Sequence, residues 1–217
     1  YANTDKSSGD PCAVDANDPN LAYKFGTMAN ETVVAQTFNK DLANEYGKIC
    51  GNYSLWSNLT IFWGCGTNLH RSPYNARNHE YYSEDAVLTS GQAVAFISGG
   101  KEYGVIIAPK HLAFNDTEIN RLGVSVFMTE QQARENELRG TQAAIEDAGA
   151  LGVMTAFNRV GITAANAHTG LLKNILRGEW GFKGLESQDF IMNPNYAVLK
   201  EYALNGGTMT TFTGENT

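Results

Sequence analysis

The sequence predicts an α/β fold built on a parallel sheet with crossover helices. Segments with the apolar pattern of a strand alternate along the chain with segments that have the period of an amphipathic helix, in the order β, α, β, α, β, α, β, α. Polar side chains follow the apolar run of each predicted strand. In parallel α/β architectures these strand ends share one face, so the same pattern predicts a functional site there.

The first half of the chain begins with an irregular lead-in at residues 1–30, followed by a helix at about 31–55. A β-rich run at 59–70 ends in a glycine-broken polar loop, and a long loop spans 72–87. The apolar side of the first helix comprises Val33, Val34, Phe38, Leu42, Tyr46 and Ile49. Helical spacing brings these residues to one face, so we expect the helix to pack through them.

The second half continues the alternation. A helix at 89–103 precedes a buried strand at 104–111, and a long helix at 129–149 begins with Thr129 as its N-cap. The remaining elements are strand 152–160, helix 168–179, strand 184–190 and helix 195–204. We find no internal repeat, linker or low-complexity tract, which predicts a single domain.

The composition is typical of a globular protein and excludes some partners. The chain of 217 residues is 42% hydrophobic and 18% charged, which is sufficient for one core. Its formal net charge is -7 and it has no basic run, so nucleic acid and anionic membranes are not expected partners. No apolar run approaches the length of a membrane-spanning helix.

The cysteines bear on the cellular compartment. The 3 cysteines, Cys12, Cys50 and Cys65, cannot all pair with one another and match no zinc spacing. We interpret them as thiols, although two of them could form a disulfide. Because the polar residues 1–20 are no signal peptide, a bacterial cytoplasmic location is favoured, with secretion as the alternative. Sequons that would matter only in a secreted eukaryotic protein occur at Asn30, Asn52, Asn58 and Asn115.

Polar residues at the strand ends are the candidate site. They are Asn68 and His70, Lys110 and His111, Asn158 and Arg159, and Asp189. Loops of α/β proteins are polar in any case, so a single one of these residues would be explained equally well as a solvated loop residue. Asp189 in particular could be a turn residue, or a catalytic carboxylate at the end of a barrel strand.

Longer motifs make the chain resemble glycoside hydrolase family 3, the β-glucosidase group, over roughly residues 10–207. They are "HRSPYNARNHEYYSED" (70–85), "KHLAFNDTEINR" (110–121), "GVMTAFNRVG" (152–161) and "LLKNILRGEWGFKGLESQDF" (171–190). The resemblance implies a TIM-barrel-type (β/α)8 catalytic domain, incomplete in this chain, with residues 1–217 as one partial barrel domain. The barrel's first strand, with its sugar-binding Asp, and an α/β sandwich domain are expected to be missing.

The resemblance also implies roles for individual residues. Asp189 lies at the position of the nucleophile in a retaining, exo-acting β-glycosidase, which forms a covalent glycosyl-enzyme. The implied substrate-binding residues are Arg77, Lys110, His111, Arg121 and Phe157. Glu118 and Arg71 are implied as supporting residues. Such an enzyme needs a second carboxyl group as acid, about 5–5.5 Å from the nucleophile.

Each of these residues also has a purely structural interpretation. Lys110 could be an ion-pair donor beside a buried His111, Arg77 could form an ion pair with Glu80 in its loop, and Phe157 could be a core residue. The chain departs from the family pattern at Cys65 and His79. It also departs at the polar residues Glu186, Ser187 and Gln188, where a barrel strand is usually apolar.

The first functional expectation is therefore a β-glucosidase that acts on terminal non-reducing β-D-glucosyl residues of a β-glucoside or oligosaccharide. A further chain or segment would complete the barrel and supply the acid/base Glu. The alternatives are a truncated or degenerate sugar-binding barrel without catalysis and, among enzymes, a β-xylosidase. No cofactor motif is present, and His70, His79, His111 and His168 are too scattered to predict a metal site.

Overall fold

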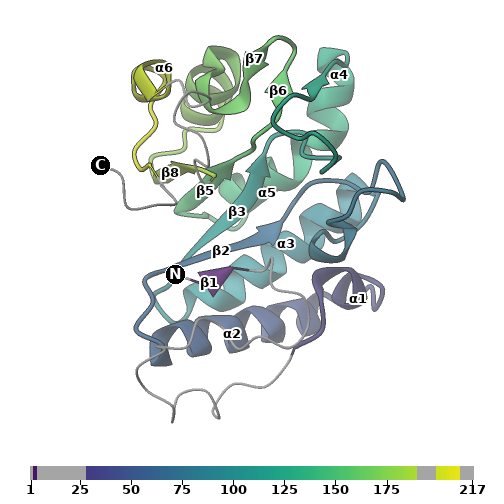
Figure 1. The fold of residues 1–217 in the computed structure, drawn as a ribbon. Helices are drawn as coiled ribbons and strands as arrows, with labels where there is room; N and C mark the ends of the chain where they lie inside the picture. The colour runs from purple at the N-terminus through teal and green to yellow at the C-terminus, as the bar shows by residue number, and fades with distance from the viewer. Residues whose placement is uncertain (1, 4–27, 190–198, 211–217) are drawn as a thin grey trace.

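The computed structural model describes residues 2–3, 28–189 and 199–210, and in them the predicted parallel sheet is present (Figure 1). Its strands lie in the order β1-β2-β3-β5-β8, and every neighbouring pair runs parallel. They are β1 (Ala2–Asn3), β2 (Ile61–Gly66), β3 (Ile106–Leu112), β5 (Gly152–Thr155) and β8 (Leu185–Gln188). A bridge between Ser187 and Met209 extends the sheet beyond β8. The fold is thus α/β with a parallel sheet.

One expectation about the start of the chain is wrong in part. We expected an irregular lead-in and no strand before the β-rich run, but Ala2 and Asn3 form β1 beside Phe62 and Trp63 of β2. The rest of the lead-in up to residue 27, which includes Cys12, lies outside the described residues. Cys50 and Cys65 are both buried and are not joined to each other by a disulfide.

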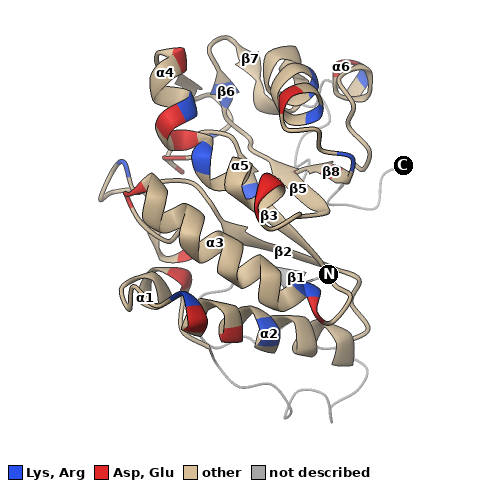
Figure 2. Cartoon of the chain, turned by 180° about the vertical axis from the view of Figure 1, so that it is seen from behind, with Lys and Arg blue, Asp and Glu red and all other residues tan. Residues whose placement is uncertain are grey.

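Helical segments cover the sheet. They are α1 (Glu31–Ala35), α2 (Lys40–Trp56), η1 (Asn78–Glu80), α3 (Ala86–Lys101), α4 (Glu130–Gln132), η2 (Ala133–Glu137), α5 (Arg139–Glu146), η3 (Ala165–Ala167), η4 (Gly170–Glu179) and α6 (Leu199–Leu204). Helix α3 lies between α2 and α5 (Figure 1). It carries almost no charged residue, whereas α2 and α5 carry several (Figure 2), because its two flanks pack against these neighbours.

Alternate residues of the strands enter two cores on opposite faces of the sheet. Phe62 and Ile107 pack with helices α2, α3 and α5 on one face. Their neighbours Trp63 and Ala108 pack with Met154 on the other face. This alternation follows from the period of two residues in a strand. It places Lys110, two residues after Ala108, at the end of β3 on the face away from the helices.

The helix predicted at 31–55 is two helices. Phe38 has a left-handed φ of 51°, and Asn39 caps α2 by accepting hydrogen bonds from the backbone N–H groups of Asp41 and Leu42. The predicted apolar face is also wrong, because Phe38 is 76% exposed and Ile49 is 40% exposed. Helix α2 instead buries small residues, which a hydrophobicity pattern does not mark as a contact face.

Glycines bring α2 and α3 into backbone contact. A Cβ at Gly47 of α2 would collide with the carbonyl group of Phe96, and one at Gly99 of α3 would collide with the carbonyl group of Asn44. These close approaches explain why the small side of α2 is the buried one.

The helix predicted at 129–149 begins with the expected N-cap, because the backbone N–H of Gln132 donates to Thr129 Oγ1 over 3.2 Å. It is not continuous, however. A π-helical turn, η2, lies between α4 and α5.

The strand predicted at 152–160 is likewise divided. Its first part is β5, which ends at Thr155, and the last two residues of the predicted strand form β6 (Arg159–Val160) in a second sheet. That sheet, with the order β4-β6-β7, includes β4 (Ser125–Val126) and β7 (Thr163–Ala164) and was not predicted.

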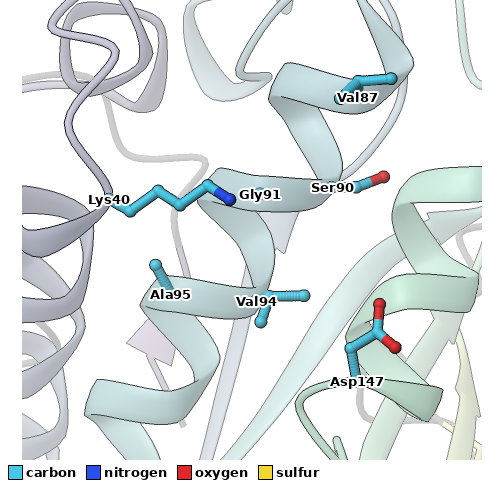
Figure 3. A pocket seen from close by; sticks show the side chains of 7 residues that line it. All are labelled: Lys40, Val87, Ser90, Gly91, Val94, Ala95 and Asp147. Carbon is cyan, nitrogen blue, oxygen red and sulfur yellow. The ribbon is translucent and has the colours of Figure 1, made fainter.

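The glycine contact between α2 and α3 can be tested with a matched pair of substitutions. We expect Gly47→Ala to lower the free energy of unfolding by ~1–3 kcal/mol, because the added methyl group meets backbone that cannot rotate away. Gly91→Ala should leave stability unchanged or raise it by up to about 1 kcal/mol. A methyl group at Gly91 would meet only the end of the Lys40 side chain, which is flexible and can move away. Figure 3 shows this side chain pointing at Gly91 in a surface hollow lined by residues of α2, α3 and the end of α5. Urea denaturation followed by circular dichroism measures both, and equal effects would contradict the prediction.

Candidate active site

Most of the predicted site residues meet at the carboxyl ends of the strands. Lys110 and His111 lie near the end of β3, Arg77 belongs to the loop after β2, and Asp189 directly follows β8. The Asp189 Oδ2 atom lies 3.6 Å from His111 Nε2. This separation is a close contact rather than a hydrogen bond. The structure therefore brings residues far apart in the sequence to the face that the strand ends were predicted to share.

The carboxylate of Glu80 holds the cations of the site. Arg77 Nε donates to Glu80 Oε2 over 2.8 Å and Arg77 Nη2 to Glu80 Oε1 over 2.6 Å. Lys110 Nζ lies 3.3 Å from the same Oε1, and both Lys110 and Glu80 are buried. The alternative interpretation of Arg77 and Lys110 as ion-pair donors is thus confirmed. Two cations thus share this one carboxylate at the carboxyl ends of the strands.

The contacts of His111 define its tautomer. Arg77 Nη2 lies 3.2 Å from His111 Nε2, and a guanidinium group can only donate, so Nε2 accepts. The proton of the neutral ring is then on Nδ1, which lies 3.1 Å from Tyr81 Oη. Burial raises the pKa of Tyr81 well above its usual value, so this hydroxyl stays neutral. A neutral His111 leaves the positive charge of this cluster on Arg77 and Lys110.

The backbone of His111 is fixed as firmly as its ring. Asn68 Nδ2 donates to the His111 carbonyl over 3.0 Å, and the His111 N–H donates to Asn68 Oδ1 over 2.8 Å. On the ring side, Asn115 Nδ2 donates to Tyr81 Oη over 2.8 Å. Sequence analysis placed Asn68 among the polar strand ends but missed Tyr81 and Asn115. Both lie inside the quoted motifs, which is the only signal that could have identified them.

Glu118 connects the remaining predicted residues to the site. Its Oε1 lies 3.4 Å from Arg77 Nη1, and its Oε2 lies 2.9 Å from Arg121 Nη1. The Arg121 guanidinium group lies 4.4 Å above the centre of the Phe157 ring, and Phe157 is buried. Arg121 and Phe157 thus form one unit with Glu118. Arg71 belongs to a separate cluster with Asp116 and Glu137.

The polar residues of β8 are accommodated in different ways. Asn166 Nδ2 donates to Gln188 Oε1 over 2.9 Å, and Ser187 Oγ donates to the Gln188 carbonyl over 2.9 Å. Burial raises the pKa of Glu186 to about 8, so its carboxyl group is mostly neutral at pH 7. The strand therefore tolerates side chains that looked incompatible with a buried position.

Among the residues that the structure describes, no three His, Cys, Asp or Glu side chains are grouped as metal ligands. Within the same ranges, no helix has the length and hydrophobicity needed to cross a membrane.

Known proteins are similar to this sequence over most of its length. A family model described as "Glycosyl hydrolase family 3 N terminal domain" matches residues 20–203. "Probable beta-glucosidase J" of Emericella nidulans is 35% identical over 176 residues, which cover 81% of this chain and 20% of that protein. A "Beta-glucosidase" of Ruminococcus albus is also 35% identical, with 81% of this chain and 18% of that protein covered. The chain thus spans about a fifth of the length of these relatives.

Solved structures have the same fold. The structure of beta-glucosidase 3B from Thermotoga neapolitana in complex with alpha-D-glucose superposes with a TM-score of 0.84 at 31% identity, over 95% of this chain and 28% of that one. DesR, a beta-glucosidase from Streptomyces venezuelae in complex with D-glucose, gives a TM-score of 0.81 at 31% identity, over 87% and 24% of the two chains. The neighbours are barrel-type domains, so the described sheet is part of a (β/α) barrel.

The ion cluster predicts a large cost for neutralising its carboxylate. We expect Glu80→Gln to lower the free energy of unfolding by ~3–5 kcal/mol, because Arg77 and Lys110 would remain buried without their counter-charge. The control is Glu45→Gln, which removes an exposed ion pair with Lys48 and should cost less than ~1 kcal/mol. Urea denaturation curves of the two variants provide the measurement. Similar losses in both would show that the Glu80 cluster does not stabilise the fold.

Proposed function

Because the chain belongs to glycosyl hydrolase family 3, we propose that it forms part of a retaining β-glycosidase with Asp189 as the nucleophile. The observation that carries this proposal is the position of Asp189. Its carboxylate directly follows β8 and lies 3.6 Å from His111 Nε2, at the face where Lys110 and Arg77 also end. A nucleophilic carboxylate must be ionised, and nearby cations favour that form.

The proposed reaction has two steps. The carboxylate of Asp189 attacks the anomeric carbon, the bond to the aglycone oxygen breaks, and that oxygen takes a proton from a separate acid. In the second step, water attacks the anomeric carbon of the glycosyl ester and gives a proton to the group that acted as the acid. The bond to Asp189 breaks, which releases the sugar and the free carboxylate. Arg77, Lys110 and His111 are proposed to bind the hydroxyls of the sugar ring, and Arg121, Glu118 and Phe157 to hold these residues in place.

We propose that the acid comes from outside this chain. The described carboxylates closest to the cations of the site, Glu80 and Glu118, are bound by Arg77, Lys110 and Arg121 and are therefore poor proton donors. The sheet order ends in β1 on one side, and the bridge of Ser187 to Met209 continues it on the other. Both sides fit a barrel domain spanning residues 1–217 that a further segment or chain completes.

We propose terminal β-D-glucosyl residues as the substrate group, because the compared relatives are named β-glucosidases and two solved neighbours contain glucose. A β-xyloside is the alternative within the same reaction. The second candidate function is a sugar-binding barrel without catalysis. It is favoured by the ion pairs of Glu80 and Glu118, which leave neither carboxylate as a good proton donor. For the location, we propose a reducing compartment such as the cytoplasm, which the buried thiol of Cys65 supports.

The nucleophile can be trapped. We expect a 2-deoxy-2-fluoro-β-glucoside with a good leaving group to leave one glycosyl adduct on Asp189 of the full-length polypeptide, detected by mass spectrometry. Asp189→Asn should abolish the adduct and lower kcat on the order of 10⁴-fold, because a carboxamide is no nucleophile here. The control is Asp147→Asn, an exposed change at the end of α5, which should leave the adduct on Asp189 and the value of kcat unchanged.

The outcomes distinguish the candidates. A trapped adduct at another residue would contradict the role of Asp189. Binding of glucose without any adduct would favour the sugar-binding module. Faster trapping by the corresponding 2-fluoroxyloside would assign the alternative sugar.

A further inference from the structure

A second ionic cluster lies beside the candidate active site. It consists of Arg71 from the loop after β2, Asp116 from the loop after β3, and Glu137 from η2. Arg71 Nη1 lies 3.0 Å from Asp116 Oδ2, and Arg71 Nε lies 3.4 Å from Glu137 Oε1. Both carboxyl groups are buried, whereas Arg71 is partly exposed. One guanidinium group thus joins two loops of the site to a helix.

The charges of this cluster do not balance if both acids are ionised. Each acid has one further oxygen, Asp116 Oδ1 and Glu137 Oε2, to which no N–H or neutral O–H group of the described residues donates. Because both acids contact the same guanidinium group, these two oxygens can be satisfied by a hydrogen bond between the carboxyl groups, and such a bond is also one cause of the shift of each pKa. A hydrogen bond between two carboxyl groups requires a proton on one of them. The cluster therefore holds one proton in addition to the charge of Arg71.

The environment assigns that proton to Glu137. Burial raises the pKa of Asp116 to about 6 and that of Glu137 to about 8. Arg71 lowers both, while the negative charge of Asp116 raises the pKa of Glu137 further. These three residues are the charged groups that act on one another in the described part of the chain. At pH 7, Glu137 is thus mostly the donor and Asp116 the acceptor.

The π-helical turn gives Glu137 its inward position. Glu137 is the last residue of η2 and is buried, whereas the preceding acids Glu130 and Glu135 are exposed. A π-turn contains one residue more than an α-helical turn and is often found at functional sites. This local irregularity is what brings a buried carboxyl group to the loop of Asp116.

Short links connect the cluster to the active site. Asp116 follows Asn115, which donates to Tyr81 Oη over 2.8 Å and to Glu118 Oε1 over 3.0 Å. On the other side, Arg71 belongs to the same loop as Arg77. A change in the cluster would therefore displace both loops that orient the cations of the site.

We propose that Glu137 is a positioning residue, whose carboxyl proton bridges to Asp116 so that the bridged pair and Arg71 hold the two active-site loops together. This role goes beyond the proposed hydrolysis, since it makes the geometry of the site depend on pH. When the bridging proton leaves, two adjacent carboxylates share one guanidinium group, and their repulsion separates the loops.

The sign of the pH dependence follows from the raised pKa values. The folded chain retains the Glu137 proton at pH values at which the unfolded chain, with a pKa of about 4.3, has lost it. The contribution of this group to stability is complete below about pH 4 and is lost as the pH rises through about 8. Asp116 contributes in the same direction at lower pH, with a folded pKa of about 6.

The test compares wild type with Glu137→Gln and Glu137→Leu in the full-length polypeptide. The Gln amide still donates to Asp116 but does not titrate, and Leu removes the donor. We expect the Tm of Glu137→Gln to rise relative to wild type as the pH increases from about 5 to about 9. The alkaline limb of kcat/KM should move to higher pH in the same variant, whereas Glu137→Leu should lose activity at every pH. A Gln variant with the pH profile of wild type would overturn the proposal.

Glu186→Gln is the matched control, because it removes another buried acid with a raised pKa that has no contact with Arg71. Two readouts do not depend on glycosidase activity. Infrared difference spectra against wild type should show the loss of one protonated-carboxyl band in Glu137→Gln and of a second one in Glu186→Gln, because both acids are mostly protonated at pH 7. Hydrogen exchange in loops 67–85 and 113–124, corrected for intrinsic rates, should accelerate at alkaline pH in wild type and in Glu186→Gln but not in Glu137→Gln. No loss of protonated-carboxyl absorbance between wild type and Glu137→Gln, or equal exchange in all three proteins, would overturn the positioning role even if hydrolysis occurs.

Discussion

The contact of one buried carboxylate with two cations is the interaction on which the site depends. Glu80 binds Arg77 through two hydrogen bonds and Lys110 through a third contact, so a loop and a strand end are joined at one group. Arg77 in turn forces His111 Nε2 to accept, which fixes the tautomer of a residue in contact with Asp189. The orientation and charge of the whole strand-end face thus follow from one Glu side chain in η1.

Such a cluster is costly to bury and needs a rigid frame. Desolvation of several charges is offset only when their geometry is well fixed. The parallel sheet provides that frame, since Lys110 and His111 end a strand that pairs on both sides. Side chains complete it, because Asn68 binds both backbone polar groups of His111. The alternation of core residues then decides which side of the sheet receives the charged groups.

The sequence predicted the elements better than their contacts. Strong periodicity predicted the parallel sheet, and the N-cap at Thr129 was found because a hydroxyl before a helix has a local cause. The buried face of α2 was missed because glycines make the contact with α3, and glycine has no hydrophobic signal. The π-turn at Glu137 was missed because it inserts one residue into an otherwise regular helical pattern. In the site, the strand-end residues were predicted, whereas Tyr81 and Asn115 act through contacts between distant segments.

The loop after β2 is held by two ionic clusters with opposite imbalances. At Arg77, the three cations Arg77, Lys110 and Arg121 share the two carboxylates of Glu80 and Glu118, so the excess is positive. At Arg71, two carboxyl groups share a single cation, so the excess is negative unless a proton remains. The second cluster contains acids whose raised pKa values lie close to neutral pH. The same loop is therefore held by an ion-paired cluster at the reacting face and by a titratable cluster at its edge.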